Sequence, residues 1–450
     1  MNGGPLPRAR LGAYAALALP LAMAALPVYV FVPKLYADTL GLSLVTIGTI
    51  LLAARLLDAI QDPLLGWWSD RHAHAADGRQ RFIVAAVPLL ALGVLCLFQP
   101  PHVSGPWLAL WLTVSLAVAY LGFSMAAISY FALGAELSTD YHERTRITAV
   151  RGACGVTGVL IAAALPEMLA PVTVGDLGPG RDLGEGLRRF SLLFVPMLLI
   201  GAGLMLFGSP TPATRSPARA SAGKTLRQAL KAPLASPGFR WLLAVFVTSG
   251  VASAIPATLI LFYVQDVLDR ADLNGVFLGL YFAFGAAGMP LWVSAAKRVG
   301  KKNAWLLGMV MSVAAFVWAF ALGKGDAVEF GMVCALSGVA YGAELALPPS
   351  ILADVVDRDR AGDGDRPDGA YFGLWQLTEK LNLALGAGIA LPLLGLLGYQ
   401  PGVAQIAMGQ LSFVYAAAPC ALKLVAVATL WFAPLERAWI VPTSQGPQIP

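Results

Sequence analysis

The feature that most constrains this chain is a succession of long apolar runs along almost the whole of its 450 residues. A helix needs about 20 apolar residues to cross a bilayer, and within lipid it satisfies its own backbone hydrogen bonds. Twelve runs are long enough, and they lie near 11–33, 42–68, 82–100, 105–134, 147–172, 188–208, 238–265, 274–296, 303–323, 328–352, 370–397 and 408–434. The pattern predicts an all-α membrane protein with twelve transmembrane helices and no barrel strands.

Composition excludes a soluble globule, because 58% hydrophobic and 13% charged residues leave too little polar surface to cover one. The first run is interpreted as a membrane helix rather than a removable signal, since it is too long and no soluble domain follows it. Four cysteines lie singly in apolar runs, which favours packing over a disulfide framework or a zinc site. They are Cys96, Cys154, Cys334 and Cys420.

The basic residues are distributed unevenly between the two sides of the expected membrane. About 22 of the 31 Lys and Arg residues lie at the termini or in the loops on the same side as the termini, against about six in the opposite loops. This positive-inside bias predicts that both termini are cytoplasmic. It also explains the net charge of +5 as a topology signal, so no nucleic-acid partner is expected.

One polar stretch divides the chain into two halves. We expect a six-helix bundle over residues 1–208, a cytoplasmic linker rich in Pro, Ala, Ser and basic residues over 209–237, and a second six-helix bundle over 238–450. A short interfacial helix is expected at residues 224–231. The halves share features at matching helix ends, such as GWWSDR and PLWVSAAKR, which indicates two pseudo-repeats.

Three charged residues lie within the second apolar run, in the stretch ARLLDAIQDPLLGWW. Arg55, Asp58 and Asp62 are three and four residues apart, so their side chains fall within about 60° of one helix face. Each charge in the hydrocarbon costs at least ~2.5 kcal/mol, so the cluster should face the protein interior or an aqueous cavity. Two carboxylates there indicate a site for a proton or a hard cation such as sodium. The alternative is a structural pair in which Arg55 merely neutralises Asp58.

Polar residues also interrupt the eleventh run. Gln376 and Lys380 share a helix face, whereas Glu379 points about 100° away from Lys380. A lysine at this depth can compete with a cation for the two carboxylates described above, which would couple cation binding to transport. The alternative is that Lys380 extends toward the membrane interface.

Other candidates are weaker, and several kinds of chemistry are absent. The candidate substrate-binding residues are Arg151, Trp375, Gln376 and Tyr130, and Glu136, Glu344 and Tyr371 are further candidates. Arg151 alternatively belongs to the cytoplasmic basic belt, and Glu136 and Asp354 are expected to contact basic loops. His72 and His74 lack further ligands, which favours a solvated loop over a metal site. The sequence has no GxxxxGK[ST] phosphate loop and no paired nucleophile and base, so neither an enzyme nor a cofactor beyond a coupling ion is expected.

Four stretches resemble the glycoside-pentoside-hexuronide:cation symporter family of the major facilitator superfamily. They are GLSLVTIGTILLAARLLDAIQDPLLGWWSDR, ERTRITAVRG, LPPSILADVVDRD and GLWQLTEKLNLALGAGIALPLLGLLGY. The resemblance implies the major facilitator fold. It also implies that Asp58 and Asp62 are the cation-site carboxylates and that Lys380 lies beside them at the interface between the halves. Arg151 is similar to the helix-five arginine associated with sugar binding.

The sequence departs from this family at Ala22 and Ala127, which stand where its melibiose permease has acidic residues. Sugar recognition by paired carboxylates is therefore not expected. We expect a proton- or sodium-coupled symporter of a small organic solute, with a glycoside as one candidate, acting as a monomer in the cytoplasmic membrane. The alternatives are a carrier of an amphiphile such as a lysolipid, which the two alanines favour, and a proton-driven exporter.

The expected orientation is testable by labelling. A cysteine introduced at Ser221, in the most basic stretch of the chain, should resist an impermeant thiol reagent in intact cells and react after lysis. Reaction from outside intact cells would reverse the orientation.

Overall fold

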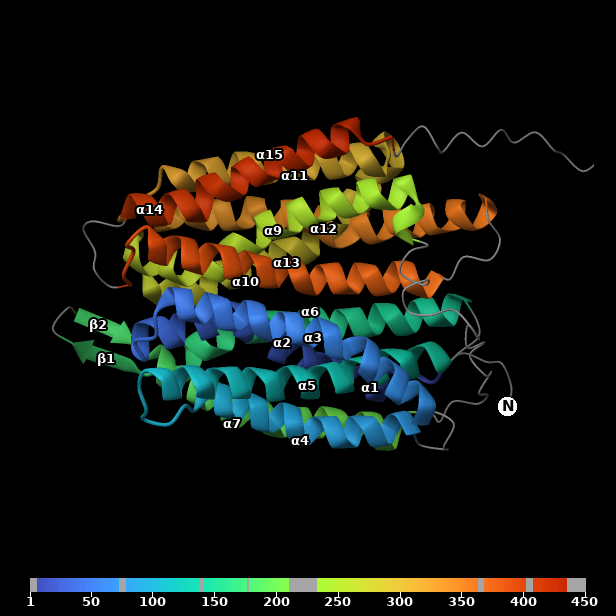
Figure 1. Ribbon diagram of the computed structural model, residues 1–450, viewed down its shortest axis with the longest axis horizontal. Coiled ribbons are helices and arrows are strands. Elements are labelled where there is room, and N and C mark those ends of the chain that lie inside the picture. Colours follow the sequence, from blue (N-terminus) through green and yellow to red (C-terminus); the bar gives the residue numbers. More distant parts are fainter. Residues whose placement is uncertain are drawn as a thin grey trace, which may run out of the picture.

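The computed structural model describes residues 6–72, 78–137, 141–175, 178–209, 233–362, 368–401 and 408–434. In Figure 1 the long helices run side by side in two bundles, one from each half of the chain. The elements are α1 (Arg8–Ala15), α2 (Ala18–Lys34), η1 (Leu35–Thr39), α3 (Leu44–His72), α4 (Gly78–Phe98), α5 (Pro106–Glu136), α6 (Tyr141–Leu169), β1 (Val172–Gly175), β2 (Gly178–Arg181), α7 (Leu183–Gly208), α9 (Pro237–Asp266), η2 (Ala271–Leu273), α10 (Asn274–Val299), α11 (Lys301–Phe320), α12 (Ala327–Gly362), α13 (Asp368–Leu396), α14 (Met408–Ser412), η3 (Phe413–Ala417) and α15 (Ala418–Phe432).

Twelve helical segments within the described residues are long and apolar enough to cross a membrane, which confirms the predicted fold class. The first runs from Arg8 to Thr39 and includes the π-turn η1, so it is longer than the run at 11–33. Pro33 lies just before η1 and offers no N–H to the helix, so a change of hydrogen-bond pattern is expected there.

The fold contains one short β-hairpin, which the periodicity did not predict. Strands β1 and β2 pair antiparallel between α6 and α7, outside the twelve candidate spans. Each strand has only four residues, which is too short for an alternating pattern to stand out in the sequence.

Local sequence signals set several helix ends. The Asp182 carboxylate accepts a hydrogen bond from the backbone N–H of Glu185 and caps α7, and the Ser236 hydroxyl caps α9 in the same way. Gly300 is the single residue between α10 and α11, and its φ of 86° is a conformation that favours glycine. The one-residue connection at Gly300 makes α10 and α11 adjacent helices.

Helices α1 to α7 form one bundle and α9 to α15 form the other (Figure 1). Helix α7 ends at Gly208 and α9 begins at Pro237, on either side of the expected linker. Residues 210–232, which include the expected helix at 224–231, lie outside the described residues.

The two bundles touch most closely where α3 runs against α13, toward the end that carries the hairpin. A Cβ atom added at Gly48 would lie 2.6 Å from Cδ of Pro392, and one added at Gly388 would lie 2.9 Å from Cβ of Leu52. Because glycine has no side chain, it lets the two helices approach closely at these points.

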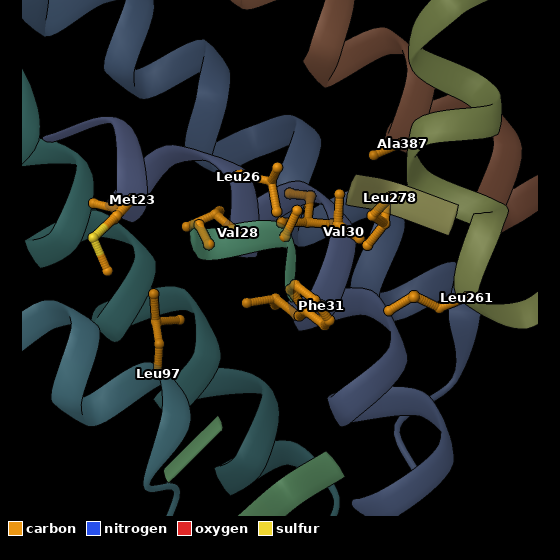
Figure 2. Packing of buried hydrophobic residues seen from close by; sticks show 14 of the residues in the cluster. Met23, Leu26, Val28, Val30, Phe31, Leu97, Leu261, Leu278 and Ala387 are labelled. Carbon is orange, nitrogen blue, oxygen red and sulfur yellow. The ribbon is translucent and has the colours of Figure 1, made fainter. Parts of the chain in front are cut away.

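The hydrophobic core continues across the interface between the bundles. Figure 2 shows Val30 and Phe31 of α2 in one packed group with Leu261, Leu278 and Ala387 of the second bundle. A buried polar contact lies at the same end, where the Asn274 amide of α10 donates to Oε1 of Glu167 on α6 at 3.3 Å. The bundles are therefore joined by packing at the hairpin end.

The close approach at Gly48 can be tested by adding one methyl group. Gly48→Ala should lower the midpoint of thermal unfolding, because overpacking typically destabilises by about 1–3 kcal/mol. Gly152→Ala is the matched control, since a Cβ there meets nothing within 4 Å, and its midpoint should stay unchanged or rise. Equal midpoints for the two variants would show that α3 and α13 do not pack as closely as described.

Candidate functional site

Helices α3 and α13 bring three charged residues together between the two bundles. Lys380 Nζ lies 2.9 Å from Oδ2 of Asp58, and it also forms an ion pair with Oδ2 of Asp62. Lys380 lies 12 residues after the start of α13 and Asp62 lies 10 residues before the end of α3, so both are about 15–18 Å inside their helices. The structure thus directs Lys380 toward the two carboxylates rather than toward the membrane interface.

Asp58 is only 1% exposed, and uncharged side chains also donate hydrogen bonds to its carboxylate. The Ser124 hydroxyl, from α5, donates to Oδ1 of Asp58 at 2.8 Å and accepts a hydrogen bond from Lys380 Nζ at 3.1 Å. The Gln61 amide donates to the same Oδ1 atom at 3.0 Å. Neither Ser124 nor Gln61 was predicted from the sequence, because uncharged polar residues are too frequent in such helices to stand out.

Arg55 is the second cation of the cluster. Its Nη1 atom lies 3.5 Å from Oδ2 of Asp58, and its guanidinium lies 4.2 Å from the ring centroid of Tyr120 on α5. The stack on Tyr120 holds the buried guanidinium beside the carboxylate. With Lys380 and Asp62 included, two positive and two negative groups give the cluster a formal charge of zero.

The carboxylate of Asp62 is less completely satisfied than that of Asp58. Its Oδ1 atom is buried and has no hydrogen-bond partner among the described residues, while Oδ2 is engaged by Lys380. Two carboxylates and the Ser124 hydroxyl supply the oxygen ligands that a hard cation prefers, and either carboxylate can take up a proton. The Lys380 ammonium therefore stands where a coupling cation would find its ligands.

Trp375 and Gln376 precede Lys380 on α13 by five and four residues. Trp375 is buried, its ring stacks on Phe246 of α9 at 3.7 Å, and its Nε1 atom donates to Oε1 of Glu379 at 3.0 Å. Gln376 is exposed. Their role in substrate binding stays a prediction.

Tyr130 and Arg151 lie together in the first bundle. Tyr130 is fully buried, its ring stacks on that of Tyr14 at 4.7 Å, and its hydroxyl donates to the Tyr14 carbonyl at 3.0 Å. Arg151 is half-buried, and its guanidinium lies 4.5 Å from the ring centroid of Phe131. Tyr130 therefore packs within the bundle, whereas Arg151 has an accessible face.

The remaining candidates are Asp354, Tyr371, Glu136 and Glu344. Asp354 pairs with Lys301, as expected of a contact with a basic loop, and the Tyr371 hydroxyl donates to Oδ2 of Asp359 at 2.8 Å. The side chain of Glu136 lies outside the described part of the chain. Glu344 pairs with Lys423, a residue that the sequence analysis missed although it too interrupts an apolar run.

Comparison with known proteins identifies the family. The profile described as MFS/sugar transport protein matches residues 13–437. The chain belongs to this family. It is 26% identical to a glucuronide carrier protein homolog of Escherichia coli, over 90% of this chain and 88% of that protein. It is 20% identical to a sodium-dependent lysophosphatidylcholine symporter of Danio rerio, over 81% of this chain and 74% of that protein.

The fold has a solved counterpart as well. A crystal structure of a bacterial homolog of the human lysosomal transporter Spinster, inward-facing and occupied, superposes with a TM-score of 0.67 at 15% identity, covering 94% of this chain and 96% of that one. These matches confirm the major facilitator fold and the resemblance to glycoside-pentoside-hexuronide:cation symporters. The chain is thus an integral membrane transporter, as its relatives are, and not an enzyme.

The geometry predicts that Lys380 competes with cations for the two carboxylates. In Lys380→Met, added sodium or protons should raise the thermal midpoint at lower concentrations than in the wild type, because the competing ammonium is gone. Lys324→Met is the control, because Lys324 is exposed and its Nζ atom pairs with Oδ2 of Asp269, also an exposed residue, at 3.2 Å. An unchanged cation response in Lys380→Met would remove Lys380 from the cation site.

Proposed function

We propose that this protein is a symporter that couples the transport of a small organic solute to the entry of a proton or a sodium ion. The observation that carries the proposal is the position of Lys380, whose ammonium lies between two carboxylates of the other bundle. A carboxylate pair buried in a membrane protein is unstable without positive charge, so the pair is neutralised either by Lys380 or by a bound cation.

The proposed coupling follows from where these groups lie in the fold. Asp58 and Asp62 belong to the first bundle and Lys380 to the second, so their ion pairs bridge the two bundles. A cation bound by the carboxylates releases Lys380 and weakens that bridge. Because the cation stabilises only the arrangement in which its ligands are free, cation binding shifts the balance between arrangements of the bundles.

Asp62 is the better candidate for the primary cation ligand. Arg55, Gln61 and Ser124 continue to contact Asp58 when Lys380 leaves, whereas Asp62 has one oxygen that no described group satisfies. When Lys380 leaves, an incoming proton or sodium ion thus replaces more missing contacts at Asp62 than at Asp58. Either ion fits this argument, because both neutralise a carboxylate.

The substrate is proposed from the relatives and from the accessible side chains. The glucuronide carrier homolog supports a glycoside, and Arg151 and Gln376 are the predicted substrate residues whose side chains are accessible. Ala22 lies where α2 and α6 pack closely, with its Cβ 3.1 Å from a Cβ added at Gly158, which leaves little room there for a larger acidic side chain.

An amphiphilic solute is the second candidate. The match to a lysophosphatidylcholine symporter and the apolar residues Ala22 and Ala127 support it. The proposed location is the cytoplasmic membrane, with both termini in the cytoplasm, and the proposed functional unit is the monomer.

Amide substitutions test the cation site directly. Asp62→Asn and Asp58→Asn should each reduce gradient-driven accumulation at least about tenfold in proteoliposomes, with sodium and proton gradients imposed separately. Exchange of solute across the membrane should be reduced less, because it needs no net cation movement. We expect Asp62→Asn to have the larger effect on cation dependence.

The proteoliposome assay uses labelled methyl glucoside, methyl glucuronide and lysophosphatidylcholine in turn. The solute that the wild type accumulates identifies the substrate class. Asp269→Asn, at an exposed position, is the control and should accumulate solute normally. Undiminished accumulation in both site variants under both gradients would refute the proposed cation site.

A further inference from the structure

A second buried ion pair lies entirely within the second bundle. Lys423 of α15 is 4% exposed, and its Nζ atom lies 2.5 Å from Oε1 of Glu344 on α12. Two serines of α9 complete the cluster: the hydroxyls of Ser249 and Ser253 both donate to the Glu344 carboxylate. Lys423 Nζ also donates to the Ser253 hydroxyl at 2.7 Å and to the Ser249 carbonyl at 3.3 Å. Three helices thus converge on one carboxylate and one ammonium.

This ion pair faces a cavity with an aromatic wall. Glu344, Lys423 and Ser253 line it together with aromatic residues of α10, α11, α12 and η3 and with Val30 of the first bundle. The atom-free space in and around this cavity is about 820 Å³, and this volume includes space that is open to solvent. The aromatic residues are Tyr281, Phe282, Phe316, Tyr341 and Tyr415. The charged groups and the aromatic rings therefore line the same space, which is the arrangement that would suit a ligand with one charged and one apolar part.

Stability alone does not account for a charged pair at this place. Replacing a buried ion pair by apolar residues of similar volume is often neutral or stabilising. The two hydroxyl donors stabilise the ionised Glu344 carboxylate, and they lose that role when the carboxylate takes up a proton. Protonation also leaves the Lys423 ammonium without a counter-ion while it still faces the cavity.

We propose that Lys423 binds the carboxylate of a solute that has an apolar or aromatic body, in exchange for the Glu344 carboxylate, which takes up a proton. The site then changes from Glu344 (−1) with Lys423 (+1) to neutral Glu344, Lys423 (+1) and ligand (−1). Its net charge is zero in both states, and one proton accompanies each anion. The solute class rests on the proposed function as a transporter, but binding at this site does not depend on the cation site between α3 and α13.

Other ionisable groups face the pair from the elements packed against it. Tyr281 of α10, Tyr341 of α12 and Cys420 of α15 line the same cavity as Glu344 and Lys423. Glu344 is the only carboxylate among the described residues that line the cavity, so we assign the proton exchange to this group.

The proposal is tested by binding to the purified full-length protein, with no gradient imposed. Phenylacetate should raise the thermal midpoint more at about pH 5 than at about pH 8, because its binding requires a proton on Glu344. Its apparent Kd should weaken about tenfold per pH unit where Glu344 is ionised. Phenylacetamide, which has the same shape without the charge, should have no effect. Equal effects of the two compounds, or no effect of phenylacetate at either pH, would overturn the proposal.

Variants assign the effect to the pair. Glu344→Gln imitates the protonated carboxyl, so phenylacetate should stabilise it equally at both pH values, and Lys423→Met should abolish the effect. If Lys423→Met does not fold, the double variant Glu344→Gln/Lys423→Met is used instead, because it leaves no unpaired charge at the site. Lys324→Met is the matched surface control and should respond like the wild type. Stabilisation that survives the loss of Lys423, or stays pH-dependent in Glu344→Gln, would contradict the assignment. This experiment measures binding and not cation-driven uptake, so failure of this site and failure of the cation site are distinguishable.

Discussion

Charge neutrality in the middle of the membrane is the constraint on which the arrangement of the two bundles depends. Removing one partner of a buried ion pair typically destabilises a protein by about 3–5 kcal/mol, because it leaves an uncompensated charge. Arg55 and Asp58 balance one another within α3, but Asp62 depends on Lys380, which the other bundle contributes. Among the described residues Lys380 is the cation that pairs with Asp62, and this pair holds α13 beside α3. In the proposed mechanism a bound cation removes this restraint, and one small site thereby affects the position of both bundles.

The contacts at the hairpin end are of a different kind. Gly48 and Gly388 let α3 and α13 pack closely there, and Lys34 of α2 lies 4.6 Å from the Phe262 ring of α9 while pairing with Asp38 of its own bundle at 2.5 Å. Separation at this end would leave Lys34 still paired with Asp38. Apart from the hydrogen bond from Asn274 to Glu167, the contacts described at this end are packing and cation–π contacts, and breaking them leaves Lys34 paired, which is suitable for an interface that opens and closes.

The sequence predicted the parts of this protein in which each residue obeys a strong local constraint. The twelve spans could be predicted because a helix in lipid must satisfy its own backbone hydrogen bonds. Asp58, Asp62 and Lys380 could be singled out because a charge in an apolar run has a high free energy. Ser124 was not predictable, because a hydroxyl in a membrane helix is inexpensive and becomes significant only when another helix places a carboxylate beside it. Lys423 obeyed the same charge rule as Lys380 and was overlooked. The β-hairpin and the π-turn η1 depend on a few residues each, too few for a periodic signal.

The two buried lysines differ in what their ligands can affect. Lys380 bridges bundles, so whatever displaces it changes the contact between α3 and α13. Lys423 and the described groups that it bonds, Glu344, Ser249 and Ser253, belong to the second bundle, so the proposed anion would leave that bridge intact. The first arrangement is suited to coupling ion binding to a conformational change, and the second is suited to recognising a solute. Val30 of the first bundle also lines the cavity of Lys423, so movement of that bundle would change the lining of the cavity. Recognition and coupling can in this way occupy different helices and still respond to the same motion.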